Sequence, residues 1–287
     1  MKLKVVTDST CDLPERYFKD YEIDVVPINI QFGNETFLDG ITIDHKTFYQ
    51  KINESGLMPK TSLPSVGQFA EAYRNWARQG YDTILSLHIT AVLSGVMNAA
   101  RLAAQEVAGE IKVIPFDTLS GSAAAGFMCI DAVEMARAGR TLEEILEHLK
   151  EVAPRVRISL TLATLRYAAM SGRISNLQSL LASVFNIKPV VCVHEGHLIP
   201  EGRFRSRQAA IAHIVELTEQ TAGPVPIKLA VLHAQAEQDA AALLAQVQSR
   251  VNWVDSFMGD LTTSIAVHFG PGVVGTVVYP VVGKEVK

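Results

Sequence analysis

The sequence predicts an α/β protein of two domains, with a helix-covered parallel sheet in the first and an α+β arrangement with an antiparallel sheet in the second. In the first half, short apolar runs rich in β-branched residues alternate with segments that begin at helix-capping residues. In the second half, a hairpin signal lies among further strand and helix patterns. The chain has 287 residues, enough for two hydrophobic cores, and we expect the domains at 1–155 and 156–287.

The elements of the first domain follow from apolar runs and capping residues. Strands are expected at 3–7, 23–32, 83–88 and 111–116. Asp12 stands where it would cap a helix that begins near Pro14. Ser65 and Gln68 have the spacing of a capping box, which predicts a helix as far as about Arg78. Further helices are expected from Ser94 to about 109, over 120–138, and after Thr141.

The second domain mixes strands with helices. Strands are expected at 158–163, 188–193, 197–200, 226–233, 263–269 and 273–280. Helices are expected at 175–184, 207–221 and 235–250. Glu195-Gly196 predicts a hairpin between two of the strands, and Gly270-Pro271-Gly272 predicts a turn between the last two.

Composition excludes several classes of function. The formal net charge is −4, and nucleic-acid binding needs clustered Lys and Arg, which occur only in the short stretch from Arg203 to Arg207. The three cysteines are far apart, which argues against a disulfide framework or a zinc site. No signal-peptide pattern and no membrane-spanning run is found, so we expect a cytoplasmic protein.

Metal and cofactor sites are not expected. His194 and His197 flank the hairpin turn, and they lack the helical i, i+4 spacing with an intervening Glu that zinc proteases use. Neither a Walker loop nor a GxGxxG sequence follows the first strand. That strand leads instead into a polar turn, in which the roles of Asp8 and Ser9 stay open.

Two hydroxyl-bearing segments are candidates for binding an anion. Thr61 and Ser62 lie between two prolines, just before the helix that Ser65 caps. Ser94 also precedes a helix and follows a strand. Helix N-termini offer free N–H groups and a partial positive charge, so both segments are able to contact one carboxylate. Ordinary helix capping is the alternative interpretation of each.

Arg173 and His268 complete the set of candidates. Arg173 lies on a glycine turn and is either solvated or a contact for a partner protein or a phosphate. His268 lies in an apolar run before Gly270, where a packing role is the alternative to contact with a carboxylate.

Six short motifs of this sequence occur in the order found in the DegV family, which the chain resembles over nearly its whole length. They are Thr7-Asp-Ser-Thr-Cys-Asp-Leu-Pro14, Thr61-Ser-Leu-Pro-Ser65, Leu93-Ser-Gly95, Gly172-Arg-Ile174, Asn186-Ile-Lys-Pro189 and His268-Phe-Gly-Pro-Gly272. The resemblance implies a two-domain fold with a Rossmann-like first domain. It also implies a long-chain fatty acid in a buried tunnel, with its carboxylate held between the domains.

By position, the resemblance assigns the carboxylate contacts to Thr61, Ser62 and Ser94, with His268 close by, and docking of a partner to Arg173. The implied partner is a separate ATP-dependent fatty-acid kinase that makes acyl phosphate for phospholipid synthesis. The chain itself would then be a lipid-binding protein with no catalytic residue and no cofactor, and it would touch the membrane only transiently.

The loop around Ser94 departs from the family, because it lacks the Ser-Ser and Thr-Tyr that often flank the motif. Two alternatives to the fatty-acid carrier remain. One is an enzyme that acts on a small carboxylate or acyl substrate at the same hydroxyls, which would need a serine within reach of His268. The other is a regulatory protein that holds lipid as a structural ligand.

Overall fold

The computed structural model describes residues 1–173, 177 and 187–282, and the chain divides into two compact units. The first unit consists of Met1–Leu149 together with Thr262–Ser264. The second consists of Lys150–Leu261 and Ile265–Lys287. Three residues from the C-terminal part of the chain therefore belong to the first unit by their contacts.

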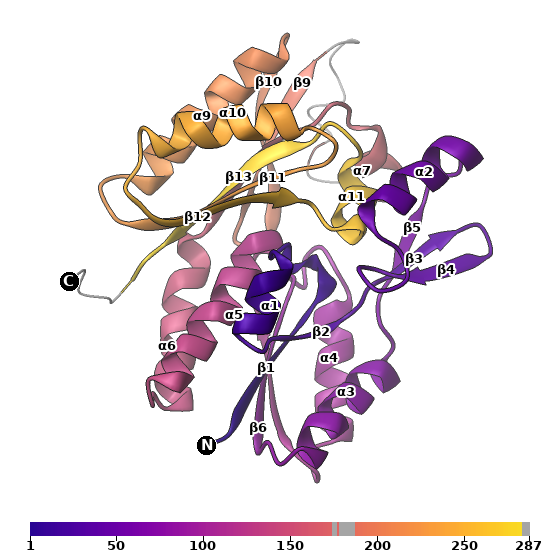
Figure 1. The fold of residues 1–287 in the computed structure, drawn as a ribbon, viewed down its shortest axis with the longest axis vertical. Coiled ribbons are helices and arrows are strands. Elements are labelled where there is room, and N and C mark those ends of the chain that lie inside the picture. The colour runs from indigo at the N-terminus through magenta and orange to yellow at the C-terminus, as the bar shows by residue number, and fades with distance from the viewer. Residues whose placement is uncertain (174–176, 178–186, 283–287) are drawn as a thin grey trace. The chain divides into compact units, whose positions relative to one another are not determined.

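A four-stranded parallel sheet forms the centre of the first unit (Figure 1). Its strands, in the order β2-β1-β6-β7, are Asp24–Val26, Leu3–Asp8, Thr83–His88 and Lys112–Asp117. Every residue of β6 is buried, as expected for a strand covered on both faces. Because the strands are parallel, Asp8 and His88 end neighbouring strands at the same edge of the sheet.

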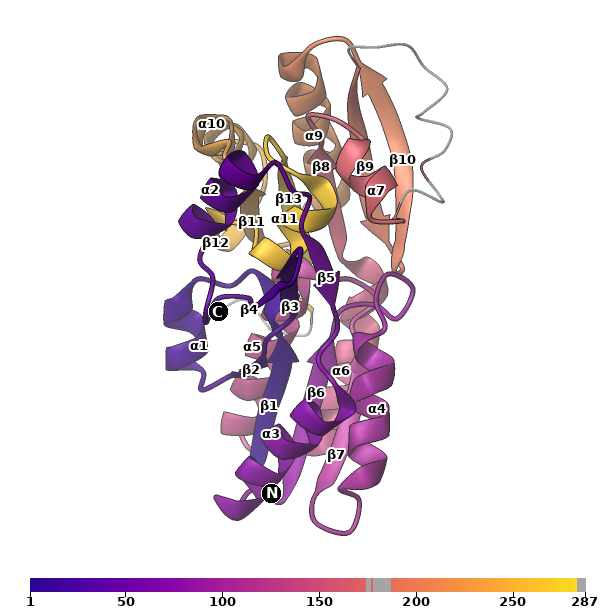
Figure 2. The same ribbon diagram turned by 90° about the vertical axis from the view of Figure 1, so that its right-hand side faces the viewer.

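Helices cover both faces of this sheet: α3 and α4 pack against each other on one face, and α5 packs against β1 and β6 on the other (Figure 2). The helices of this part of the chain are η1 (Ser9–Cys11), α1 (Glu15–Asp20), α3 (Val66–Arg78), α4 (Val96–Glu106), α5 (Ser122–Arg137) and α6 (Leu142–Val152). The capping box is confirmed: Ser65 Oγ accepts from Gln68 N at 3.1 Å, and Gln68 Oε1 accepts from Ser65 N at 2.8 Å.

A small antiparallel sheet is the second part of the first unit. Its strands, in the order β4-β3-β5, are Glu35–Leu38, Asn29–Phe32 and Lys60–Ser62, and helix α2 (His45–Ser55) lies between β4 and β5 in sequence. Residues 23–32 were expected to form one strand. Instead, the residues before Pro27 and those after it belong to strands of two different sheets. Proline has no N–H to donate to a ladder, which favours a break at this position.

The second unit contains a six-stranded mixed sheet. Its strands, in the order β10-β9-β8-β13-β11-β12, are His197–Phe204, Lys188–His194, Arg157–Thr161, Val274–Pro280, Ile227–His233 and Trp253–Asp260. All neighbouring pairs are antiparallel except β11 with β12, which is parallel. The expected hairpin is confirmed, and its turn residues Glu195 and Gly196 both have positive φ. Strand β12 was not anticipated.

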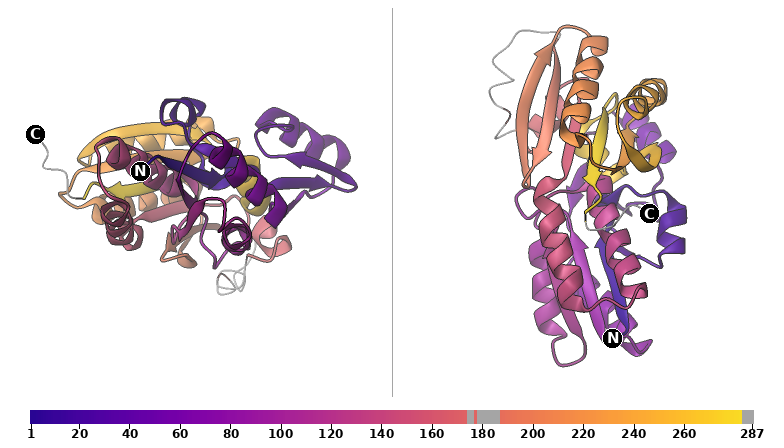
Figure 3. Two further views of the ribbon diagram at one scale, coloured as in Figure 1. Left: turned by 90° about the horizontal axis from the view of Figure 1, so that it is seen from below. Right: turned by 90° about the vertical axis from the view of Figure 1, so that its left-hand side faces the viewer.

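Helices α9 (Arg207–Ala222) and α10 (Glu237–Gln248) pack on one face of this sheet (Figure 3). The buried core between helices and strands contains Ile214, Leu229, Leu243 and Val274. Two short helical elements, η2 (Ala153–Arg155) and α7 (Arg166–Met170), precede and follow β8. The predicted α/β fold class, with a parallel sheet in one part and a largely antiparallel sheet in the other, is confirmed.

Residues 263–269 were expected to form a strand, and this prediction is wrong because they form helix α11 (Thr263–Phe269). Short apolar runs do not distinguish a strand from a buried helical segment. The helix ends where Gly270, at φ 77°, donates its N–H to Ala266 O at 2.8 Å.

The expected helix over 175–184 lies outside the described residues, apart from Leu177. Cys11, Cys129 and Cys192 are free thiols. In the part of the chain that the structure describes, no helix has the length and apolar character needed to cross a membrane.

Candidate functional site

Thr61 and Ser62 lie on strand β5, where both side chains are half-buried. The strand is held by β3, in which Ile30 faces Thr61 and Asn29 faces Ser62. The amide of Asn29 also donates to Leu63 O at 3.2 Å. Pairing with β3 therefore fixes the backbone that carries the two hydroxyls before the chain turns into α3.

Ser94 lies one residue before the N-cap of α4, which is Gly95. Ser94 Oγ accepts a hydrogen bond from Val96 N at 3.3 Å, and Ser94 N donates to Thr90 O at 3.2 Å. The side chain is half-buried. Since its oxygen is the acceptor in this contact, the hydroxyl proton is able to donate to a further group.

The two hydroxyl-bearing segments meet within the first unit. A Cβ placed on Gly95 would lie 3.1 Å from Leu63 Cδ2, so the residue after Ser62 contacts the residue after Ser94. Helices α3 and α4, which follow these segments, also pack against each other. The sequence placed hydroxyls before two helices, and the fold brings those two helix starts together.

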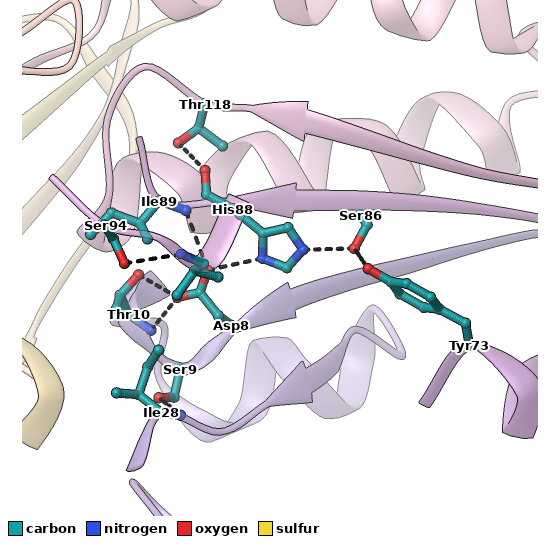
Figure 4. A network of polar contacts seen from close by, with 11 residues as sticks. Asp8, Ser9, Thr10, Ile28, Tyr73, Ser86, His88, Ile89, Ser94 and Thr118 are labelled. Atoms are coloured by element: carbon teal, nitrogen blue, oxygen red, sulfur yellow. Dashed lines mark hydrogen bonds and ion pairs between the residues drawn. The ribbon is translucent and has the colours of Figure 1, made fainter. Parts of the chain in front are cut away.

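A buried polar network underlies the Ser94 loop (Figure 4). Asp8 Oδ2 accepts from Ile89 N at 3.2 Å and lies 2.9 Å from His88 Nδ1. Burial opposes ionisation of Asp8, but hydrogen bonds from His88 and Thr10 outweigh it and hold the pKa of the carboxyl below its usual value. Asp8 thereby fixes the first residue of the loop that runs from β6 to Ser94.

The same network has the connectivity of a Ser-His-Asp triad, because His88 Nε2 lies 2.7 Å from Ser86 Oγ. Ser86 has no exposed surface, and its hydroxyl is also 2.8 Å from Tyr73 OH. A nucleophile must reach its substrate, and this one is enclosed by protein. We therefore interpret Asp8, His88 and Ser86 as a structural network.

Asp12 does not cap α1, contrary to the expectation from the sequence. The residue at the start of that helix is Pro14, and no side chain caps it. Asp12 has φ 42°, which turns its carboxylate away toward Thr262 N at 2.6 Å and Ser122 Oγ at 2.5 Å. Burial raises the pKa of Asp12 to about 7.

His268 and Arg173 both belong to the second unit. Burial, together with the positive charge of Arg173, lowers the pKa of His268 to about 4, and the effect of Arg173 indicates that the two side chains are close. Arg173 is half-buried and donates from Nη1 to Ser171 O at 2.6 Å. The histidine is therefore neutral near pH 7 in the ligand-free protein.

The sequence analysis missed Asp39, His88 and Ser86. Asp39 and His88 each bond to residues far away in the chain, and those contacts leave no local pattern. Asp8 and Ser9, whose roles the sequence left open, were the signal that could have pointed to these residues. Polar residues at the carboxyl end of a parallel strand often mark a site.

Comparisons with known proteins match one family along nearly the whole chain. The family model described as "Uncharacterised protein, DegV family" matches residues 2–281. A relative from Thermotoga maritima, described as a fatty acid-binding protein, is 31% identical over 280 residues. The match covers 96% of this chain and 96% of the relative.

Two solved structures share the fold. One, described as fatty acid binding of a DegV family protein from Thermus thermophilus, superposes with a TM-score of 0.91 at 33% identity, over 98% of this chain and 100% of that one. The other is DegV from Bacillus subtilis, described as a fatty acid binding protein. It superposes with a TM-score of 0.89 at 28% identity, over 97% of this chain and 99% of that one. The chain therefore belongs to the DegV family.

Proposed function

We propose that this protein binds one long-chain fatty acid and presents it to a separate ATP-dependent fatty-acid kinase. The observation that carries the proposal is the contact between Leu63 and Gly95, which brings the Thr61-Ser62 segment beside Ser94. Family members at 31% and 33% identity, matched over nearly their full length, are described as fatty-acid binders.

The carboxylate contacts in this proposal are the hydroxyls of Thr61, Ser62 and Ser94, together with His268. Hydroxyl donors and the positive ends of α3 and α4 suit one negative charge. Ser94 Oγ accepts from Val96 N, which leaves its proton for the ligand. His268 comes from the second unit, and its role rests on its matching position in the family.

Burial of the acyl chain supplies most of the affinity. A chain of about 14 methylenes gains roughly 11 kcal/mol on leaving water, at about 0.8 kcal/mol for each group. Several kcal/mol are lost on association, which leaves a net affinity in the range of roughly micromolar to nanomolar. The head-group contacts then set the direction in which the fatty acid enters.

The chain acts as a binding protein in this scheme and transfers no phosphate itself. The kinase moves the γ-phosphoryl group of ATP to a carboxylate oxygen of the bound fatty acid, which gives acyl phosphate and ADP for phospholipid synthesis. Arg173 contributes to docking of the kinase, and the protein contacts the membrane only to collect or release lipid.

Native mass spectrometry of the purified protein, followed by lipid extraction, tests the binding step. The expected result is a one-to-one adduct with the mass of a long-chain fatty acid. Protein that is empty and takes up no added fatty acid contradicts the proposal. Covalent labelling of Ser62 or Ser94 by a serine-directed probe would instead support the enzyme alternative.

The delivery step needs its own assay. Loaded protein, ATP and a fatty-acid kinase should yield acyl phosphate, and Arg173→Ala should reduce the rate while the protein still binds fatty acid. Loaded wild-type protein that supports no acyl phosphate formation with any such kinase would favour a regulatory role.

A further inference from the structure

Residues Thr262–Ser264 join the first unit, although the chain before and after them belongs to the second. Thr263 and Ser264 are also the first two residues of α11, the helix that carries His268. Whatever holds these residues therefore holds the beginning of that helix.

Asp39 makes most of the hydrogen bonds that hold Thr262–Ser264 in the first unit. Its Oδ1 accepts from Thr263 Oγ1 at 2.6 Å, and its Oδ2 accepts from Ser264 N at 3.3 Å and from Ser9 Oγ at 2.8 Å. Ser9 Oγ itself accepts from Ile28 N at 3.0 Å, so its proton points to Asp39. The carboxylate is buried and faces three donors.

Asp12 holds the residue just before the helix. Its Oδ1 accepts from Thr262 N at 2.6 Å, while Oδ2 accepts from Ser122 Oγ at 2.5 Å. Two buried carboxylates, from separate loops of the first unit, are thus directed at three consecutive residues. A buried carboxylate is costly to desolvate, and such groups often fix one arrangement of the chain while adding little net stability.

Helix α11 needs fixing from outside because it is short. It has seven residues, and isolated helices of this length are unstable. At its other end, a Cβ on Gly270 would clash with the ring of Tyr167, so close packing holds that end. His268 lies between these two anchors.

We propose that Asp39 is a positioning residue for fatty-acid binding, which acts through α11 by fixing the place of the His268 imidazole, with Asp12 as its second support. The inference rests on the proposed function, because it assigns His268 a contact with the carboxylate. Asp39 itself touches the helix and not the ligand.

The variant Asp39→Asn keeps the size of the side chain but removes one of its acceptor oxygens. The amide nitrogen can face Thr263 Oγ1 only if that hydroxyl turns to accept, and Ser264 N and Ser9 Oγ then donate to an uncharged oxygen. The contacts to the start of α11 are therefore weakened. The expected result is a loss of about tenfold in affinity for palmitate. Amides 265–269 of the ligand-free protein should also exchange hydrogen faster.

Asp131→Asn is the matched control. Asp131 is a buried carboxylate of the first unit, on α5, where it bonds to His148 Nε2 at 2.9 Å. This variant is expected to lose stability yet bind palmitate as tightly as the wild type. Thr263→Val, which removes a single donor to Asp39, replaces Asp39→Asn if that variant does not fold.

A double-mutant cycle with His268→Gln separates positioning from general destabilisation. If Asp39 acts through His268, adding Asp39→Asn to His268→Gln should weaken palmitate binding by less than twofold. Additive losses, or wild-type affinity and wild-type exchange in Asp39→Asn, overturn the inference. Wild-type protein that binds no palmitate overturns the proposed function, and the exchange of amides 265–269 then still reports whether Asp39 holds α11.

Discussion

Among single residues, Asp12 combines full burial with a pKa of about 7, compared with an ordinary value of 3.8. The folded protein therefore binds this proton more tightly than the unfolded chain does. The resulting stabilisation is full below about pH 4 and is lost as the pH rises to about 7, and it amounts to something on the order of 4 kcal/mol.

Asp12→Asn should remove this dependence on pH. The asparagine oxygen accepts from Thr262 N, its amide donates to Ser122 Oγ, and asparagine tolerates the positive φ at this position. Urea unfolding at pH 5 and pH 8 measures the effect, and the variant should exceed the wild type in stability at pH 8. Equal pH dependence in the two proteins would contradict the assignment.

Substitution of Ser94, another single residue, tests the proposed contacts with the carboxylate. Ser94→Ala should weaken fatty-acid binding by roughly 1–3 kcal/mol, the usual range for a hydrogen bond to a charged group. Isothermal titration of palmitate measures the loss. Ser206→Ala is the control, because Ser206 caps α9 and its removal should cost about 1 kcal/mol of stability without changing affinity. Unchanged affinity in Ser94→Ala would remove Ser94 from the site.

His268 should take up a proton when the ligand binds. A carboxylate beside the imidazole raises its pKa from about 4, so the affinity increases as the pH falls through the raised value. Titrations near pH 6 in buffers of different ionisation enthalpy measure the uptake. It should vanish in His268→Gln and persist in His148→Gln, and the same uptake in all three proteins would argue against this contact.

At the scale of elements, α11 is a segment to which sequence analysis assigned the wrong kind of structure. Its apolar run fits either a strand or a buried helix, and the residues that decide the matter are distant: Asp39 precedes Thr263 by 224 positions. Elements with their own start and stop signals were predicted well, such as α3 with its capping box and the β9–β10 hairpin. The hydroxyl segments of the candidate site were predictable for the same reason, since they adjoin helix starts.

The end of α11 offers a test of packing. Gly270→Ala meets both a positive φ of 77° and a Tyr167 ring that leaves no room for a methyl group. The expected cost is about 1–2 kcal/mol for the backbone and another 1–3 kcal/mol for the clash. Gly139 also has φ 77° but faces open space, so Gly139→Ala should show the backbone cost alone in urea unfolding. Equal losses of unfolding free energy in Gly270→Ala and Gly139→Ala would mean that the Tyr167 ring moves aside at no cost.

At the scale of the whole molecule, the proposed ligand contacts are divided between the two units: Ser94 lies in the first and His268 in the second. A fatty acid at about 100 times its Kd should raise the free energy of unfolding by about 2.7 kcal/mol. Scanning calorimetry should therefore show every unfolding transition shifted upward by palmitate. A shift confined to one of two transitions would assign the ligand to a single unit.

The three residues that Asp12 and Asp39 hold also affect the order in which the protein is completed during synthesis. The ribosome makes Met1–Leu149 first, yet Thr262–Ser264 follow only after most of the second unit has been translated. Until then, both carboxylates lack donors that they have in the finished protein. Folding from the N-terminus, the usual course for multidomain chains, therefore stops short of the final first unit until residues 262–264 have been made.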